Sequence, residues 1–210
     1  MKNFKQLLLL FMAIAVLSSC VKEEDSTEET ADSDPVEGEV TLSRETGFGD
    51  EEDWIYYSFE SNEELTGIDE SNYQTNTTWD IAFNRQNVRT NGGTSGAGEA
   101  AVIDMGELDF NAVNSAPESG YTVDSTIEIV ANLSTFPPPM MNTNGNTLLS
   151  SAIIFSGPPP VYEPNNHIYV MKTANGNYAK IQIISFYDTD GESGFVSFKF
   201  FYQADGTRSF

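Results

Sequence analysis

Alternation of apolar and polar side chains between Val196 and Phe200, near the C-terminus, most constrains the fold of this chain. Between residues 195 and 202, apolar side chains recur at every second position: Val196, Phe198, Phe200 and Tyr202. A period of two places them on one face of an extended strand, whereas an amphipathic helix has a period of about 3.6 residues. The segment therefore predicts a β-strand with one buried face.

The same period recurs along most of the chain after its first fifty residues. Apolar and aromatic runs with strand propensity lie at 54–59, 79–83, 126–130, 168–171 and 178–186. Asn175-Gly176 and Asp190-Gly191 stand between strong strand candidates, and such pairs are typical of tight hairpin turns. We therefore predict an all-β, mostly antiparallel single domain with long loops.

The first twenty residues have the layout of a lipoprotein signal peptide. Two lysines precede an apolar stretch at 7–17, which is shorter than the roughly 20 residues of a membrane-spanning helix. The stretch ends at Leu17-Ser18-Ser19-Cys20, which resembles a lipobox, and Cys20 is the single cysteine of the chain. We predict a signal peptide at 1–19 and lipidation of Cys20, which would explain an unpaired cysteine in an exported protein.

Residues 20–39 are predicted to form an acidic, disordered tether, and residues 40–210 the β domain. Nine acids lie between residues 23 and 39, so the segment cannot bury enough apolar surface to offset its ordering entropy. The run Lys22-Glu23-Glu24-Asp25 resembles a signal for export to the cell surface, although a solvated charge run is the alternative. The predicted location is the outer membrane, lipid-anchored and exposed to the outside.

Charge and residue content exclude several classes of function. Loss of the two signal-peptide lysines takes the formal charge from -22 to -24, which disfavours binding to nucleic acid or anionic lipid. Contact with the membrane is therefore expected through the anchor alone. The single histidine, His167, and the single, lipidated cysteine leave no credible hydrolytic triad or paired-histidine zinc motif, so an enzyme is not expected.

One stretch carries a family resemblance. Residues 79–96 read WDIAFNRQNVRTNGGTSG, a tryptophan strand followed by an arginine-bearing strand and a glycine loop. This block resembles the signature of the HmuY family, and three weaker matches follow in family order at 120–124, 169–182 and 194–203. The resemblance implies a fold likened to a right hand, which grips haem between loops. It also implies a lipoprotein that captures haem as cargo for a TonB-dependent outer-membrane haem receptor.

The same resemblance directs attention to the ligands of the haem iron. The best-known family members clasp the iron with two histidines on two hairpin loops, but the corresponding segments here, at 136–142 and 155–160, contain none. The first contains Met140 and Met141, and a thioether is a recognised axial ligand of haem. We predict that one of the two methionines binds the iron while the other packs against the protein. The alternative is that both are apolar residues that fill gaps in the packing and bind no iron.

Other residues are weaker candidates for the iron. His167 is expected at the start of a strand, Met171 is expected in the core, and Tyr162 is a further possibility. Arg85 and Arg89 could pair with haem propionates or internally with acids such as Asp80. Because the histidines are missing, the rival hypothesis is a β-rich surface lipoprotein that binds a glycan or a protein and no haem.

Overall fold

Antiparallel β-sheets form almost all of the regular structure, as the alternating pattern predicted. The computed structural model describes residues 34–44 and 53–210, which all fall within one unit, Ala31–Phe210. Its strands form one five-stranded sheet, one four-stranded sheet and two separate hairpins. In these residues the helices are two single 3₁₀ turns, Phe110–Ala112 and Leu149–Ser151, and none is long and apolar enough to cross a membrane.

The five-stranded sheet is built on the strands predicted most strongly. Its order is β1-β13-β12-β11-β6, with every neighbouring pair antiparallel. The glycine turn at Asn175-Gly176 joins β11 to β12, and Gly176 has the positive φ of 85° that such a turn needs. The strands are β1 (Val36–Thr41), β6 (Ala101–Asp104), β11 (Tyr169–Lys172), β12 (Tyr178–Tyr187) and β13 (Ser193–Gln203).

The four-stranded sheet contains the signature block of the sequence. Its order is β3-β2-β4-β5, and its strands are β2 (Ile55–Ser58), β3 (Glu63–Leu65), β4 (Ile81–Asn84) and β5 (Asn87–Thr90). The glycine loop that follows β5 is tightly packed, because a Cβ on Gly92 would lie 2.1 Å from the carbonyl oxygen of Ala100. The glycines of this block therefore allow close backbone approach, a role that needs no ligand.

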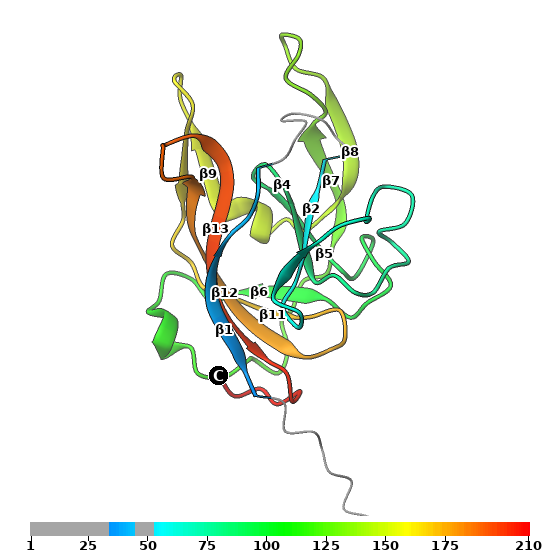
Figure 1. Ribbon diagram of the computed structural model, residues 1–210, viewed down its shortest axis with the longest axis vertical. Helices are drawn as coiled ribbons and strands as arrows, with labels where there is room; N and C mark the ends of the chain where they lie inside the picture. Colours follow the sequence, from blue (N-terminus) through cyan, green and yellow to red (C-terminus); the bar gives the residue numbers. More distant parts are fainter. Residues whose placement is uncertain (1–33, 45–52) are drawn as a thin grey trace, which may run out of the picture. The chain divides into compact units, whose positions relative to one another are not determined.

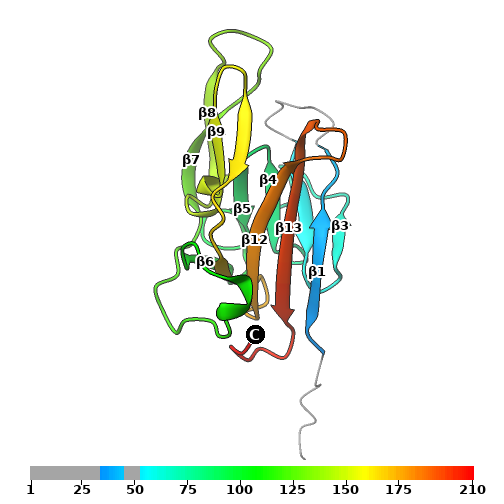
Figure 2. The same cartoon turned by 90° about the vertical axis from the view of Figure 1, so that its left-hand side faces the viewer.

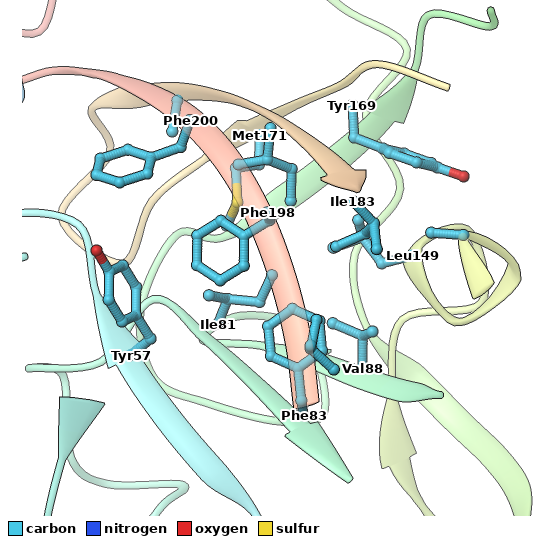
Figure 3. Packing of buried hydrophobic residues seen from close by; sticks show 14 of the residues in the cluster. Tyr57, Ile81, Phe83, Val88, Leu149, Tyr169, Met171, Ile183, Phe198 and Phe200 are labelled. Atoms are coloured by element: carbon cyan, nitrogen blue, oxygen red, sulfur yellow. The ribbon is translucent and has the colours of Figure 1, made fainter. Parts of the chain in front are cut away.

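The main core lies where the two sheets contribute their apolar faces (Figure 3). Phe198 and Phe200 from β13 meet Ile81 and Phe83 from β4, and all four side chains are buried. Phe83 stacks on Phe198 with ring centroids 5.9 Å apart. The alternation in β13 thus faces the core as predicted, because a period of two sends every second side chain to the same side.

The boundary of the predicted tether needs a correction. We expected the β domain to begin at residue 40, but β1 begins at Val36 and pairs with β13 from Val36↔Tyr202 to Thr41↔Ser197. Val36 and Val40 are half-buried against the main core, while Glu37 and Glu39 remain exposed. Ladder hydrogen bonds and two valines are enough to order an edge strand that composition alone marked as disordered. The signal peptide and Cys20 lie outside the described residues.

Candidate functional site

Two hairpins extend beyond the ends of the sheets on the same side of the described chain (Figure 1). One joins β7 (Ser125–Val130) to β8 (Met140–Gly145), and the other joins β9 (Ile153–Ser156) to β10 (Val161–Pro164). Figure 2, turned by 90°, shows both projecting in the same direction. Each loop contains three consecutive prolines, which lack the N–H that a ladder needs and so end the pairing.

A cavity of about 610 Å³ lies between these hairpins. The β7–β8 hairpin supplies one wall, the β9–β10 hairpin supplies Phe155 and Tyr162, and the turn between β4 and β5 supplies Arg85 and Gln86. The first wall consists of Val130, Leu133, Ser134, Thr135, Phe136 and Pro138. Mostly apolar walls with a few polar groups and one cation are typical of a site for a flat organic ligand.

Large apolar side chains at the cavity are unusually exposed. Phe136 is 97% exposed, and Phe155 and Leu133 are about half exposed. Among the described residues, most of the exposed large apolar side chains belong to these two hairpins, and the exceptions are Leu108 and Val123. A grouped set of exposed apolar side chains marks a binding surface more often than chance. The sequence signal for Phe136 and Phe155 was an aromatic residue beside a proline-rich loop, and we did not single either out as a site residue.

The two methionines lie in strand β8, which corrects their predicted position in a loop. Cross-strand pairing places Met140 opposite Val130 and Met141 opposite Ile129. Met141 is half-buried and packs with Ile129 against the cluster around Trp79. Met140 is 51% exposed and lies beside Val130 on the same face of the hairpin. Val130 lines the cavity, whereas Met140 lies next to it and is not itself a lining residue. The strand geometry therefore separates the pair into a packing residue and an accessible thioether.

The weaker ligand candidates lie elsewhere. His167 precedes β11, and its Nδ1 lies 2.9 Å from a carboxylate oxygen of Asp104. Met171, on β11, is completely buried in the main core beside Phe198 (Figure 3). Neither belongs to the two hairpins that enclose the cavity. Met171 is thus the core residue that its strand position predicted, and a haem could not reach it without unfolding the core.

Arg85 and Arg89, which looked equivalent in sequence, have different surroundings. The Arg89 side chain is fully buried, lies 2.9 Å from Glu70 and has its guanidinium 3.6 Å from the Trp54 ring centroid. It therefore pairs internally, although with Glu70 and not with Asp80. Arg85 lines the cavity, where its guanidinium donates hydrogen bonds to Asn84 Oδ1 at 3.2 Å and to the carbonyl of Val130.

The backbone at Arg85 is strained. Its φ of 54° occupies the first position of the two-residue turn between Asn84 and Asn87, where glycine is the usual choice. An ordinary residue in this region costs on the order of 1 kcal/mol. Strain of this kind clusters at binding sites, and here it holds a cation at the floor of the cavity.

Tyr162 brings a phenol to the cavity wall. Its ring centroid lies 5.1 Å from that of Phe155 and 4.4 Å from that of Phe186. Burial raises the pKa of the Tyr162 phenol, while the Arg85 guanidinium opposes that rise. Across residues 34–44 and 53–210, no group of three or more His, Cys, Asp or Glu side chains is placed to hold a bare metal ion.

Solved structures share this fold. The apo HmuY analogue of Tannerella forsythia matches with a TM-score of 0.63 and 20% identity, over 82% of this chain and 98% of that one. Apo PinO from Porphyromonas gingivitis matches with a TM-score of 0.61 and 21% identity, over 81% and 98%. A Bacteroides vulgatus protein described as HmuY-like gives a TM-score of 0.61 and 22% identity, over 78% and 90%.

Sequence comparison defines the family. No curated protein matches the chain. The model of the HmuY protein family matches residues 50–200, which is most of the 210-residue sequence and includes the signature block, both hairpins and most of β13. The fold and the sequence match agree, and the chain belongs to the HmuY family.

Proposed function

We propose that this protein binds haem in the cavity between its two hairpins and acts as a capture protein, not as an enzyme. The observation that carries the proposal is the mostly apolar cavity between Phe136 and Phe155, with the Arg85 cation at its floor. Haem combines a flat apolar macrocycle with two anionic propionates, so apolar walls and a nearby cation suit it. Membership in the HmuY family supports the same ligand.

Within this proposal, Met140 supplies an axial ligand of the iron. It is half-exposed on the face of Val130, whereas Met141 is turned toward the Trp79 cluster. A thioether is soft and uncharged, so it favours ferrous over ferric iron and raises the haem potential. The protein should therefore hold ferrous haem through Met140 more strongly than a site without a thioether would.

The proposed setting is the outer face of the outer membrane. A lipid on Cys20 would anchor the protein, and the acidic segment after it would hold the β domain away from the surface. Captured haem would then pass to a TonB-dependent outer-membrane receptor. Iron-starved cells given the haem-loaded protein should grow only when they carry such a receptor.

Haem titration of the purified protein tests the function directly. We expect a shifted Soret band that saturates at a single haem per chain. If neither ferric nor ferrous haem changes the spectrum, the proposal is wrong, and the exposed hairpin tips would favour the rival role of binding a glycan or a protein.

Single substitutions test the ligand. Met140→Ala should weaken ferrous haem binding by roughly 10–100-fold, the range seen when groups around a bound metal are removed. Met141→Ala should have a smaller effect, and Met105→Ala, in a different apolar cluster, is the matched control. If the double variant Met140→Ala/Met141→Ala matches wild type in affinity and spectrum in both redox states, the methionine assignment fails while haem binding stands.

A further inference from the structure

We propose that Tyr162 supplies a second axial ligand, which binds ferric iron through its phenolate oxygen from the β9–β10 hairpin. The inference rests on the proposed haem function and extends it. It gives the site one ligand from each hairpin, Met140 from β8 and Tyr162 from β10.

Geometry places the Tyr162 side chain at the cavity and holds it there. Tyr162 is the cross-strand partner of Phe155, so both side chains lie on one face of the hairpin, and both line the cavity. Its ring packs against Phe186, which is fully buried, and its main-chain N–H donates to the Tyr187 hydroxyl at 2.9 Å. Phe186 therefore packs against the Tyr162 ring, and the hydrogen bond to Tyr187 holds the main chain of Tyr162 in place.

The phenol oxygen is available for a ligand. Among the residues that the structure describes, no hydrogen bond is made by the Tyr162 hydroxyl, although the hydroxyls of Tyr57, Tyr169 and Tyr202 all have partners. The oxygen is not among the buried side-chain atoms that lack a partner, so it is accessible to solvent and to a ligand in the cavity. An acceptor or a metal in the cavity would complete its coordination.

Arg85 supplies a positive charge at the same cavity. Its guanidinium partly offsets the burial that raises the pKa of the Tyr162 phenol. On binding, the Tyr162 O–H bond breaks, the proton passes to solvent, and an oxygen–iron bond forms while the iron stays ferric. Tyrosine is an established axial ligand of haem, and an anionic oxygen suits Fe(III) better than Fe(II).

The two ligands would then have opposite redox preferences. Ferric haem is held chiefly by Tyr162, and ferrous haem chiefly by Met140. When a one-electron donor such as dithionite reduces the iron from Fe(III) to Fe(II), the phenolate takes up a proton from solvent and dissociates, and the thioether remains. Reduction would therefore change the ligand set without requiring the protein to refold.

Tyr162→Phe tests the assignment, with Tyr178→Phe as the control. Tyr178 is a half-buried tyrosine of β12 that packs in another cluster, so its loss should leave haem binding unchanged. Tyr162→Phe should weaken ferric haem roughly 10–100-fold and leave ferrous haem, reduced with dithionite, within about two-fold of wild type. Resonance Raman spectra of the ferric wild type should show tyrosinate modes that Tyr162→Phe lacks.

Porphyrins with a redox-inert metal test how the charge of the metal affects binding by Tyr162, without any change of oxidation state. Gallium(III) protoporphyrin should lose affinity in Tyr162→Phe, and zinc(II) protoporphyrin should not, because only the trivalent metal favours the phenolate. Tyr162→His controls for the possibility that Tyr162→Phe weakens binding by disturbing the packing of the cavity. An imidazole at this position should restore ferric haem binding, with a low-spin spectrum.

The outcomes are distinguishable from failure of the haem function itself. Wild type that binds ferric haem, with Tyr162→Phe equal to it in affinity and Raman spectrum, overturns the Tyr162 assignment and leaves haem binding intact. Wild type that binds haem in neither redox state overturns both proposals.

Discussion

The carboxylate of Asp80 accepts a hydrogen bond at 2.9 Å from the main-chain N–H of Ala174, across 94 positions of sequence. Its other oxygen accepts from the N–H of Phe59 at 2.8 Å. Asp80 immediately precedes β4 of the four-stranded sheet, and Ala174 lies in the turn between β11 and β12 of the five-stranded sheet. This side chain therefore ties the two sheets together from a buried position.

The first prediction concerns the pH dependence of Asp80. Burial raises its pKa from 3.8 to about 6, so the folded state binds this proton more tightly than the unfolded state does. The contribution of Asp80 to stability is therefore fully present below pH 3.8 and is lost as the pH rises through about 6. Asp80→Asn should destabilise by about 1–3 kcal/mol, because an amide NH₂ would face a main-chain donor.

Urea denaturation at several pH values checks this prediction. The difference in unfolding free energy between wild type and Asp80→Asn should shrink from pH 4.5 to pH 8. Because the other acids titrate in both proteins, their contribution to the unfolding free energy cancels in this difference. A difference that is constant or grows over this range would contradict the raised pKa.

The second prediction concerns Arg89. Its guanidinium lies between the rings of Trp54 and Tyr73 and donates to Glu70, Tyr56 and Thr143. A lysine ammonium is not planar, so it can neither stack between the two rings nor donate to several acceptors in the fixed geometry of a guanidinium. Arg89→Lys should therefore destabilise the protein by on the order of 3 kcal/mol. Thermal and urea unfolding would measure the loss. Arg208→Lys, which alters an exposed ion pair with Glu118, should change stability by less than about 1 kcal/mol.

The third prediction compares two adjacent residues of β13. Phe198 is completely buried in the main core, so Phe198→Ala should cost about 3–5 kcal/mol through lost burial and a cavity. Lys199 lies on the other face, where its Nζ is 4.6 Å from the Phe110 ring centroid. Lys199→Ala should therefore cost only about 0.5–1 kcal/mol. Similar unfolding free energies for the two variants would mean that this strand register is wrong.

The fourth prediction concerns location. Burial of acyl chains contributes about 0.8 kcal/mol per CH₂, so Cys20→Ala should move the protein from the membrane fraction to the soluble fraction. Cys20→Ser is expected to behave in the same way. Surface exposure is a separate question, which protease treatment of intact cells answers. Wild type that resists protease until the cells are lysed would contradict display on the outside.

The sequence alone determined the fold class and the orientation of the central strands. Alternation at Val196, Phe198 and Phe200 predicted which side chains face the core, because a strand sends every second residue to one side. Asn175-Gly176 marked a hairpin because a turn with positive φ favours glycine. The family resemblance carried by residues 79–96 was confirmed by the family model and by the solved structures.

Only the tertiary structure decided how similar residues divide their roles. Arg85 and Arg89 are four positions apart in one block, yet Arg89 is enclosed with Glu70 while Arg85 lines the cavity. Met140 and Met141 are neighbours, and only their pairing with Val130 and Ile129 shows which thioether is accessible. The cavity brings together Arg85, Phe136 and Tyr162, which are widely separated in sequence. Local pattern cannot encode such proximity, because it depends on how two hairpins and a turn from different sheets come to one place in the folded chain.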